Sequence, residues 1–321
     1  MRKWITFLMT FLVGATASYA NANMGQVNFE AGYRHDNISW RQHHGGAFHT
    51  NTRFKDLDIF QIGVKARSMV GCNFYVRAAA HWGWILDGDF EQSVSTFAST
   101  GIGSAFYGSF SDDIEFTARS RDVIDDRYVY DLSAAIGYPF YFCDCTLALA
   151  PVVGYSFDEQ NLRVQNDSVD FTSGGFDTSV FFPVVGSGCC WHKFTNKWYG
   201  PFVGVDFVYR PCNECWNLYA EVEYHWAQFK GKSSRSFNDE FNHRARDAHG
   251  WVFALGADYD FSNCWTLGLS LKFQDYRANR HHRHHHSSYG SDDSSFFGSG
   301  RESNKHKWDS YAINVTVGRD F

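Results

Sequence analysis

Apolar and polar side chains alternate along most of this 321-residue chain. In ten segments, apolar or aromatic residues occupy about every second position, which is the period of a β-strand viewed from one face. These segments cover residues 27–33, 60–66, 74–84, 130–138, 147–155, 203–209, 218–226, 251–259, 265–273 and 311–321. The pattern predicts an all-β chain of about ten strands.

The positions between the apolar residues carry glycines and charged side chains of both signs, among them Glu30, Arg77, Glu221 and Lys272. A soluble barrel would turn its apolar face inward. Here the apolar face is broad and aromatic while the other face holds charges, which suits lipid outside and a polar lumen inside. We therefore expect a closed antiparallel transmembrane β-barrel.

The predicted connections alternate in length. Short links lie at 71–73, 143–145, 211–215 and 262–264, and long links lie at 37–55, 87–126, 158–197, 231–246 and 277–307. Bacterial barrels have short periplasmic turns and long outer loops, so this alternation predicts the same topology with both termini in the periplasm. A soluble β-sandwich or lipocalin-like barrel also has regular strands, but it explains neither the alternation nor the terminal Phe321.

Residues 1–22 are predicted to be a secretory signal peptide, which leaves residues 23–321 for the barrel. Arg2 and Lys3 form a basic start, residues 4–13 are mostly apolar, and small residues follow. The alternative is an anchoring helix, for which this apolar run is too short. Export predicts a place in the bacterial outer membrane, in contact with its lipid. The formal net charge of −6 argues against a nucleic-acid partner.

Cysteines mark every short turn. The turn cysteines are Cys72, Cys143, Cys145, Cys212, Cys215 and Cys264, and a long connection contains the adjacent Cys189 and Cys190. Closely spaced cysteines could also be metal ligands or a redox pair, but exported proteins favour disulfides. We expect structural disulfides or disulfide links to other envelope proteins.

Two groups of residues could support acid–base chemistry. Asp87 and Asp89 follow the third segment, and extending the alternation of that segment places both carboxylates on the lumen side. Two close carboxylates can share a proton and activate water. Asp239 and His243 in the fourth long connection could form an acid–base pair. The alternative interpretation is a turn at the first site and a solvated loop at the second.

This layout resembles the omptins, the outer-membrane aspartyl proteases. The resemblance rests on about ten strands, five outer connections of these relative lengths and the Asp-x-Asp of Asp87 and Asp89. It implies that these two aspartates face an Asp–His pair, of which Asp239 matches the aspartate. The family histidine falls on Phe241, which cannot accept a proton, and His243 lies two residues further on. The catalytic set implied by the resemblance is therefore degenerate.

The chain is also similar in type to outer-membrane proteins and porins of chlamydia-related bacteria. It is exported, aromatic-rich and cysteine-bearing, and it ends in Phe321. Those envelopes depend on disulfide cross-links, so the resemblance implies the same use for the turn cysteines.

A histidine tract lies in the last long connection. It consists of His281, His282, His284, His285 and His286, interrupted by one arginine. Imidazole side chains suit zinc, copper and nickel, so the tract could capture metal at the surface. The alternative interpretation is a hydrophilic loop tip, because no fixed geometry is implied. No motif in the chain implies a cofactor.

Three functions fit these features. We expect a non-enzymatic surface barrel of the outer membrane, porin-like or structural. The alternatives are an omptin-like endopeptidase and a loop-mediated adhesin or metal-binding surface protein. Barrels of about eight strands are filled by side chains, whereas sixteen strands leave an aqueous channel. A ten-stranded lumen lined by charges of both signs could therefore be closed by its own ion pairs.

Overall fold

A computed structural model describes the following residues: 25–44, 48–70, 74–96, 114–120, 127–143, 146–165, 191–211, 214–235, 240–261, 264–281 and 303–321. The signal peptide predicted for residues 1–22 lies outside them. Among the described residues, no helix is long and apolar enough to cross a membrane.

The described residues form strands that pair antiparallel in one sheet. They are β1 (Gly25–His44), β2 (Phe48–Val70), β3 (Phe74–Thr96), β4 (Ile114–Ser120), β5 (Tyr128–Gly137), β6 (Phe140–Phe142), β7 (Leu147–Gln165), β8 (Trp191–Tyr209), β9 (Trp216–Arg235), β10 (Glu240–Asp260), β11 (Trp265–His281) and β12 (Ser303–Asp320).

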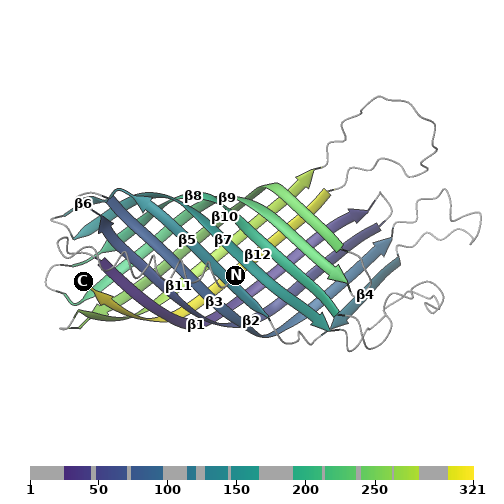
Figure 1. Cartoon of the computed structure of the whole chain (residues 1–321), viewed down its shortest axis with the longest axis horizontal. Coiled ribbons are helices and arrows are strands. Elements are labelled where there is room, and N and C mark those ends of the chain that lie inside the picture. Colours follow the sequence, from purple (N-terminus) through teal and green to yellow (C-terminus); the bar gives the residue numbers. More distant parts are fainter. Residues whose placement is uncertain are drawn as a thin grey trace, which may run out of the picture.

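Ten strands close the barrel, in the order β1, β2, β3, β5, β7, β8, β9, β10, β11, β12 and back to β1. The short β6 pairs with β7 beyond the end of β5, and β4 pairs with the outer part of β3. Figure 1 shows the strands tilted around the barrel axis, with the carboxy terminus at one end and β4 at the other. The predicted all-β transmembrane barrel of about ten strands is confirmed.

The first and last strands close the seam of the barrel. Their pairing runs from Gln26 opposite Asp320 to Arg41 opposite Lys305. At the periplasmic end, Gly25 and Phe321 exchange two backbone hydrogen bonds of 3.2 and 2.9 Å. The terminal residue therefore completes the wall rather than extending from it.

Side chains alternate between lipid-facing and lumen-facing positions, as the sequence predicts. On β12, Val315 is 51% exposed while the neighbouring Asn314 and Thr316 are 3% and 1% exposed. Phe29 on β1 and Leu269 on β11 are 62% and 58% exposed. A folded protein does not leave such a continuous apolar surface to water, so this belt is a surface for lipid.

The strands extend well beyond the apolar belt. Strands β2 and β3 have 23 residues each, which corresponds to roughly 55 Å along the barrel axis at a rise of about 3.3 Å and a tilt of about 40°. The apolar belt of such barrels is about 25 Å tall. The wall therefore projects past the membrane on the side of the long connections.

The predicted length of the first long connection is wrong, because the strands continue into the projecting wall. The first long connection, expected at 37–55, is mostly strand, and only residues 45–47 separate β1 from β2. The phase of the alternation inverts here, because the inward Ile38 and Trp40 are buried and apolar while the outward residues are polar.

Candidate functional site

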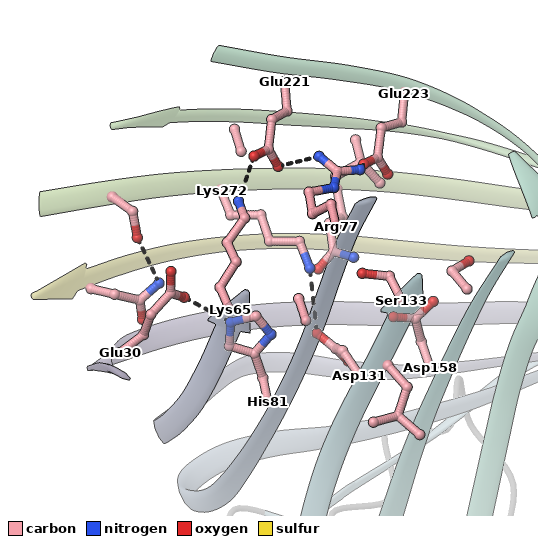
Figure 2. A pocket seen from close by; sticks show the side chains of 18 of the residues that line it. Glu30, Lys65, Arg77, His81, Asp131, Ser133, Asp158, Glu221, Glu223 and Lys272 are labelled. Carbon is pink, nitrogen blue, oxygen red and sulfur yellow. Dashed lines mark hydrogen bonds and ion pairs between the residues drawn. The ribbon is translucent and has the colours of Figure 1, made fainter. Parts of the chain in front are cut away.

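Charged side chains from opposite walls meet inside the barrel. Glu221 of β9 accepts hydrogen bonds from Lys65 Nζ at 2.6 Å and Arg67 Nη2 at 2.7 Å, both from β2. Arg77 Nη1 of β3 lies 2.7 Å from Glu221 Oε2, and the same guanidinium pairs with Glu223. In the barrel, β2 and β9 are five strands apart in either direction, so these ion pairs cross the lumen (Figure 2).

Further contacts complete this layer. Asp206 of β8 accepts a hydrogen bond of 3.0 Å from Arg77 Nη1 and one of 2.9 Å from the Tyr75 hydroxyl. Glu30 of β1 lies 2.7 Å from His81 Nε2. The buried carboxylates of Asp206, Glu221 and Glu223 thus each have the guanidinium of Arg77 beside them, which is the condition under which buried charges are tolerated.

A second polar layer lies further along the lumen. Arg34 pairs with Asp36 and with Asp131, each at 2.8 Å, and Lys272 Nζ lies 3.7 Å from Asp131. The Trp308 indole donates a hydrogen bond of 3.1 Å to Asp36. This layer links β1, β5, β11 and β12 through side chains alone.

A serine and a histidine contact each other beside a small cavity. His225 Nδ1 lies 3.0 Å from Ser156 Oγ and 3.1 Å from the Tyr276 hydroxyl, and His225 Nε2 lies 2.8 Å from Glu223. The order serine, histidine, glutamate is that of an activated nucleophile. However, Ser156 is 5% exposed, and the cavity of about 50 Å³ that it lines holds no more than a few waters. The group therefore holds side chains of the lumen in place, and the cavity beside it has no space for a substrate.

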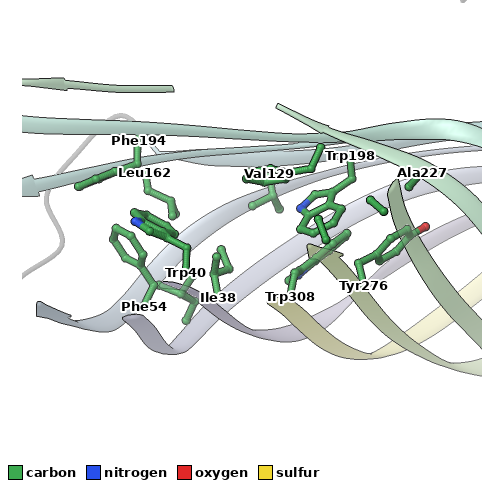
Figure 3. Packing of buried hydrophobic residues seen from close by; sticks show 14 of the residues in the cluster. Ile38, Trp40, Phe54, Val129, Leu162, Phe194, Trp198, Ala227, Tyr276 and Trp308 are labelled. Atoms are coloured by element: carbon green, nitrogen blue, oxygen red, sulfur yellow. The ribbon is translucent and has the colours of Figure 1, made fainter. Parts of the chain in front are cut away.

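Apolar side chains fill the lumen of the projecting wall. Trp198, Tyr276 and Trp308 pack with ring centroids 5.1 to 6.3 Å apart. Further out, Trp40 and Phe54 pack at 5.7 Å, within a cluster that draws on several strands (Figure 3). The described lumen is thus occupied at two levels, by ion pairs and by aromatic rings.

The predicted carboxylates of β3 lie on the outer surface. Asp87 and Asp89 are exposed, whereas Gly88 between them is buried. The expectation that both aspartates face the lumen is wrong. Ile85 and Asp87 pair with adjacent residues of β2, so Leu86 forms a bulge that shifts the alternation by one.

The structure places another acid beside this pair. Asp58 of β2 is directly opposite Asp87 and lies 3.1 Å from His35 Nδ1. Sequence reasoning missed this acid–histidine pair. Its two members lie more than twenty positions apart, and only the pairing of β1 with β2 brings them together.

The other candidate residues lie mostly outside the described part of the chain. Asp239 is outside it, and His243 belongs to β10 opposite Gly231, without a described side chain. His281 ends β11, and the rest of the histidine tract, His282, His284, His285 and His286, is outside as well. Among the described residues, no group of three or more His, Cys, Asp or Glu side chains is arranged to hold a metal ion.

Three of the predicted disulfide cysteines are described. Cys143, Cys215 and Cys264 are exposed and carry free thiols at the end of the barrel that holds the short turns. Cys143 and Cys264 have φ angles of 54° and 60°. The remaining five, Cys72, Cys145, Cys189, Cys190 and Cys212, lie outside the described residues.

Several lumen residues were not selected from the sequence. Asp131, Asp158 and Asp206 are buried in the wall, and the first two are opposite each other on β5 and β7. For Asp131 and Asp206 a signal was available, because each is an acidic residue at an inward position of an otherwise apolar segment, whereas Asp158 falls in the predicted long connection 158–197. Such a residue needs a partner on another strand, which the sequence does not name.

An apolar belt, a polar lumen and ten closed strands define an outer-membrane β-barrel. The outer membrane protease OmpT from Escherichia coli is similar over 93% of this chain and 97% of its own, with 11% identity and a TM-score of 0.61. A major outer membrane protein from Thermus thermophilus matches 91% of this chain and 100% of its own, with 11% identity and a TM-score of 0.33. No protein of curated function matches the sequence.

The sequence identifies the family. The model of the Pom family, Protochlamydia outer membrane protein, matches residues 28–321, and the chain belongs to this family. It is therefore a barrel of the bacterial outer membrane, as predicted. The similarity to OmpT shows the same fold and assigns no activity, because the two sequences are only 11% identical.

Proposed function

We propose that this chain is a non-conducting, non-enzymatic surface barrel that serves the outer membrane as a structural protein. The observation that supports it is the ion network between Lys65 and Arg67 on one wall and Glu221 on the opposite wall. Ions would have to break these buried pairs to pass, and the aromatic layer beyond them adds a second closure.

We expect the purified chain to give no conductance steps in planar lipid bilayers in which a sixteen-stranded porin conducts. Replacing Lys65, Arg77 and Glu221 with alanine, together with Trp198, Tyr276 and Trp308 of the aromatic layer, should produce measurable steps, because it removes side chains from both closures. A triple alanine variant of Asp275, Arg277 and Lys305, which point away from the lumen, should stay silent. Regular steps from the unmodified chain would overturn the proposal.

The alternative is an omptin-like endopeptidase that uses Asp87, Asp89, Asp239 and His243. We expect no cleavage of a dibasic peptide by the purified chain, because Asp87 and Asp89 are exposed on the outer wall and the family histidine is replaced by Phe241. Product formation would be followed by mass spectrometry. Cleavage that disappears in Asp89→Ala, but persists in Asp309→Ala, would establish the enzyme.

We also propose that the turn cysteines form disulfides with neighbouring envelope proteins. Support comes from Cys143, Cys215 and Cys264, which are exposed on the periplasmic rim where other chains can reach them. Non-reducing electrophoresis of envelopes should show species larger than the monomer that collapse on reduction. Replacing the three with serine should weaken those species, while a single monomeric band from the unmodified chain would contradict the idea.

A further inference from the structure

One side of the outer wall carries an exposed acidic surface just above the apolar belt. It consists of Asp56 and Asp58 on β2 and Asp87 and Asp89 on β3, and we call it the acidic face. The side chains of Asp56 and Asp58 are 70% and 42% exposed, and Asp87 and Asp89 are exposed as well.

Few positive charges neutralise the acidic face. The Tyr33 hydroxyl donates a hydrogen bond to Asp58, and the His35 ring lies 3.4 and 3.1 Å from Asp56 and Asp58. Lys55 lies opposite Asp89, but its ammonium pairs with Glu91 at 2.5 Å. The face therefore presents several carboxylates to whatever lies beside the barrel.

The opposite side carries an exposed basic surface. It consists of Lys230 and Lys232 on β9 and Arg244 and Arg246 on β10, and we call it the basic face. Lys230 is directly opposite Arg244 in the register of β9 with β10. The charge of Arg244 lowers the pKa of the Lys230 ammonium, which shows that like charges are crowded here. Asp247 is also exposed beside this face and offsets part of the charge.

The two faces lie diametrically opposite each other. Strand β9 is five strands from β2 in either direction around the barrel, and β10 is five strands from β3. On β3 the last outward apolar residue, Leu86, is followed directly by the acidic face. On β9 the last outward apolar residue, Trp226, is followed by the uncharged Gln228 and then by Lys230, so the basic face begins one outward position later. The offset between them is about 5 Å along the axis, which flexible lysine and arginine side chains can span.

We propose that each barrel binds a second copy of this chain, with the acidic face of one barrel docked on the basic face of the next in the plane of the membrane. A two-fold dimer through either face would oppose like charges, which is unfavourable. A head-to-tail contact between faces on opposite sides does not close into a ring, so it repeats as an open row. This inference goes beyond the proposed function, because it does not depend on whether the lumen conducts.

A cross-linking experiment tests the contact directly. The full chain, reconstituted in phosphatidylcholine vesicles without anionic lipid or divalent ions, would be treated with a carbodiimide, which joins a carboxylate to a nearby amine. We expect a ladder of multimers and cross-linked peptides that join Asp87 or Asp89 to Lys230 or Lys232. Such peptides cannot arise within one barrel, because the two faces lie on opposite sides of it.

Charge-reversal variants test complementarity in the same vesicles by energy transfer between donor-tagged and acceptor-tagged copies. The double variants Asp87→Lys with Asp89→Lys, and Lys230→Glu with Arg244→Glu, should each lower association at least tenfold. Mixing the two variants should restore it, since each then supplies the charge that the other lacks. Reversal of Lys305 and Lys307 on β12 is the matched control and should change little.

Other occupants of the two faces give different results. If only the basic-face variant loses association, or if rows form only after anionic lipid is added to the vesicles, the basic face binds lipid head groups and the proposal is wrong. If association requires divalent ions and disappears with a chelator, cations bridge the barrels and the direct contact is overturned. Resistance of each variant to protease in detergent verifies that it has folded.

Discussion

Replacing Arg77 with alanine is expected to lower the free energy of unfolding by about 3–5 kcal/mol, because it leaves the buried Asp206 without its cationic partner and removes one from Glu221 and Glu223. Arg77 is 3% exposed and contacts Asp206, Glu221 and Glu223 from across the lumen. Denaturant unfolding of the barrel in lipid vesicles, followed by tryptophan fluorescence, would measure the loss.

The matched control is Arg277→Ala. Arg277 also forms an ion pair at 2.8 Å, with Asp275, but its side chain is 57% exposed on the outer surface. Exposed pairs contribute about 0–1 kcal/mol, so this variant should differ little from the unmodified chain. Equal losses for the two variants would show that the lumen is hydrated and not closed.

Replacing Leu269 with arginine is expected to cost about 2–4 kcal/mol in lipid vesicles, because a charge near the middle of the belt must leave water for hydrocarbon. Leu269 lies at the centre of the apolar run of β11 and is 58% exposed. On a soluble protein the same change at so exposed a position would be nearly neutral. The sign and size of the change in stability therefore show whether lipid or water covers this surface.

Asn279→Arg on the same strand provides the control. Asn279 is exposed and lies in the projecting wall beyond the belt, where an added arginine costs about 0–1 kcal/mol. Unfolding of both variants in the same vesicles gives the comparison. A loss for Leu269→Arg no larger than that for Asn279→Arg would place the belt outside the membrane.

The sequence predicts the membrane-spanning part of the fold because lipid and lumen impose a period of two on every strand. It fails where the surroundings change. In the projecting wall the inside becomes apolar, as at Ile38 and Trp40, so the outer halves of the strands were predicted as loops. The alternation persists there with its phase inverted, as in a soluble barrel.

The candidate site was less predictable than the fold. One extra residue at Leu86 turned Asp87 and Asp89 from the lumen to the outer surface, and a bulge leaves no clear mark in a single sequence. The lumen charges lay at predicted inward positions, but their partners depend on which strands stand opposite each other. Which strands stand opposite each other follows from the closure of the barrel and cannot be read from the spacing of residues along one strand.

The seam between β1 and β12 has a consequence for assembly. The residues that it joins, such as Gln26 and Asp320, are at the two ends of the described chain, so the contact of greatest sequence separation is also the one that closes the wall. Until it forms, the first and last strands both present unpaired backbone groups that can pair with other chains. We therefore expect the edges of both strands to need protection until the seam closes, and the barrel to close late in its folding.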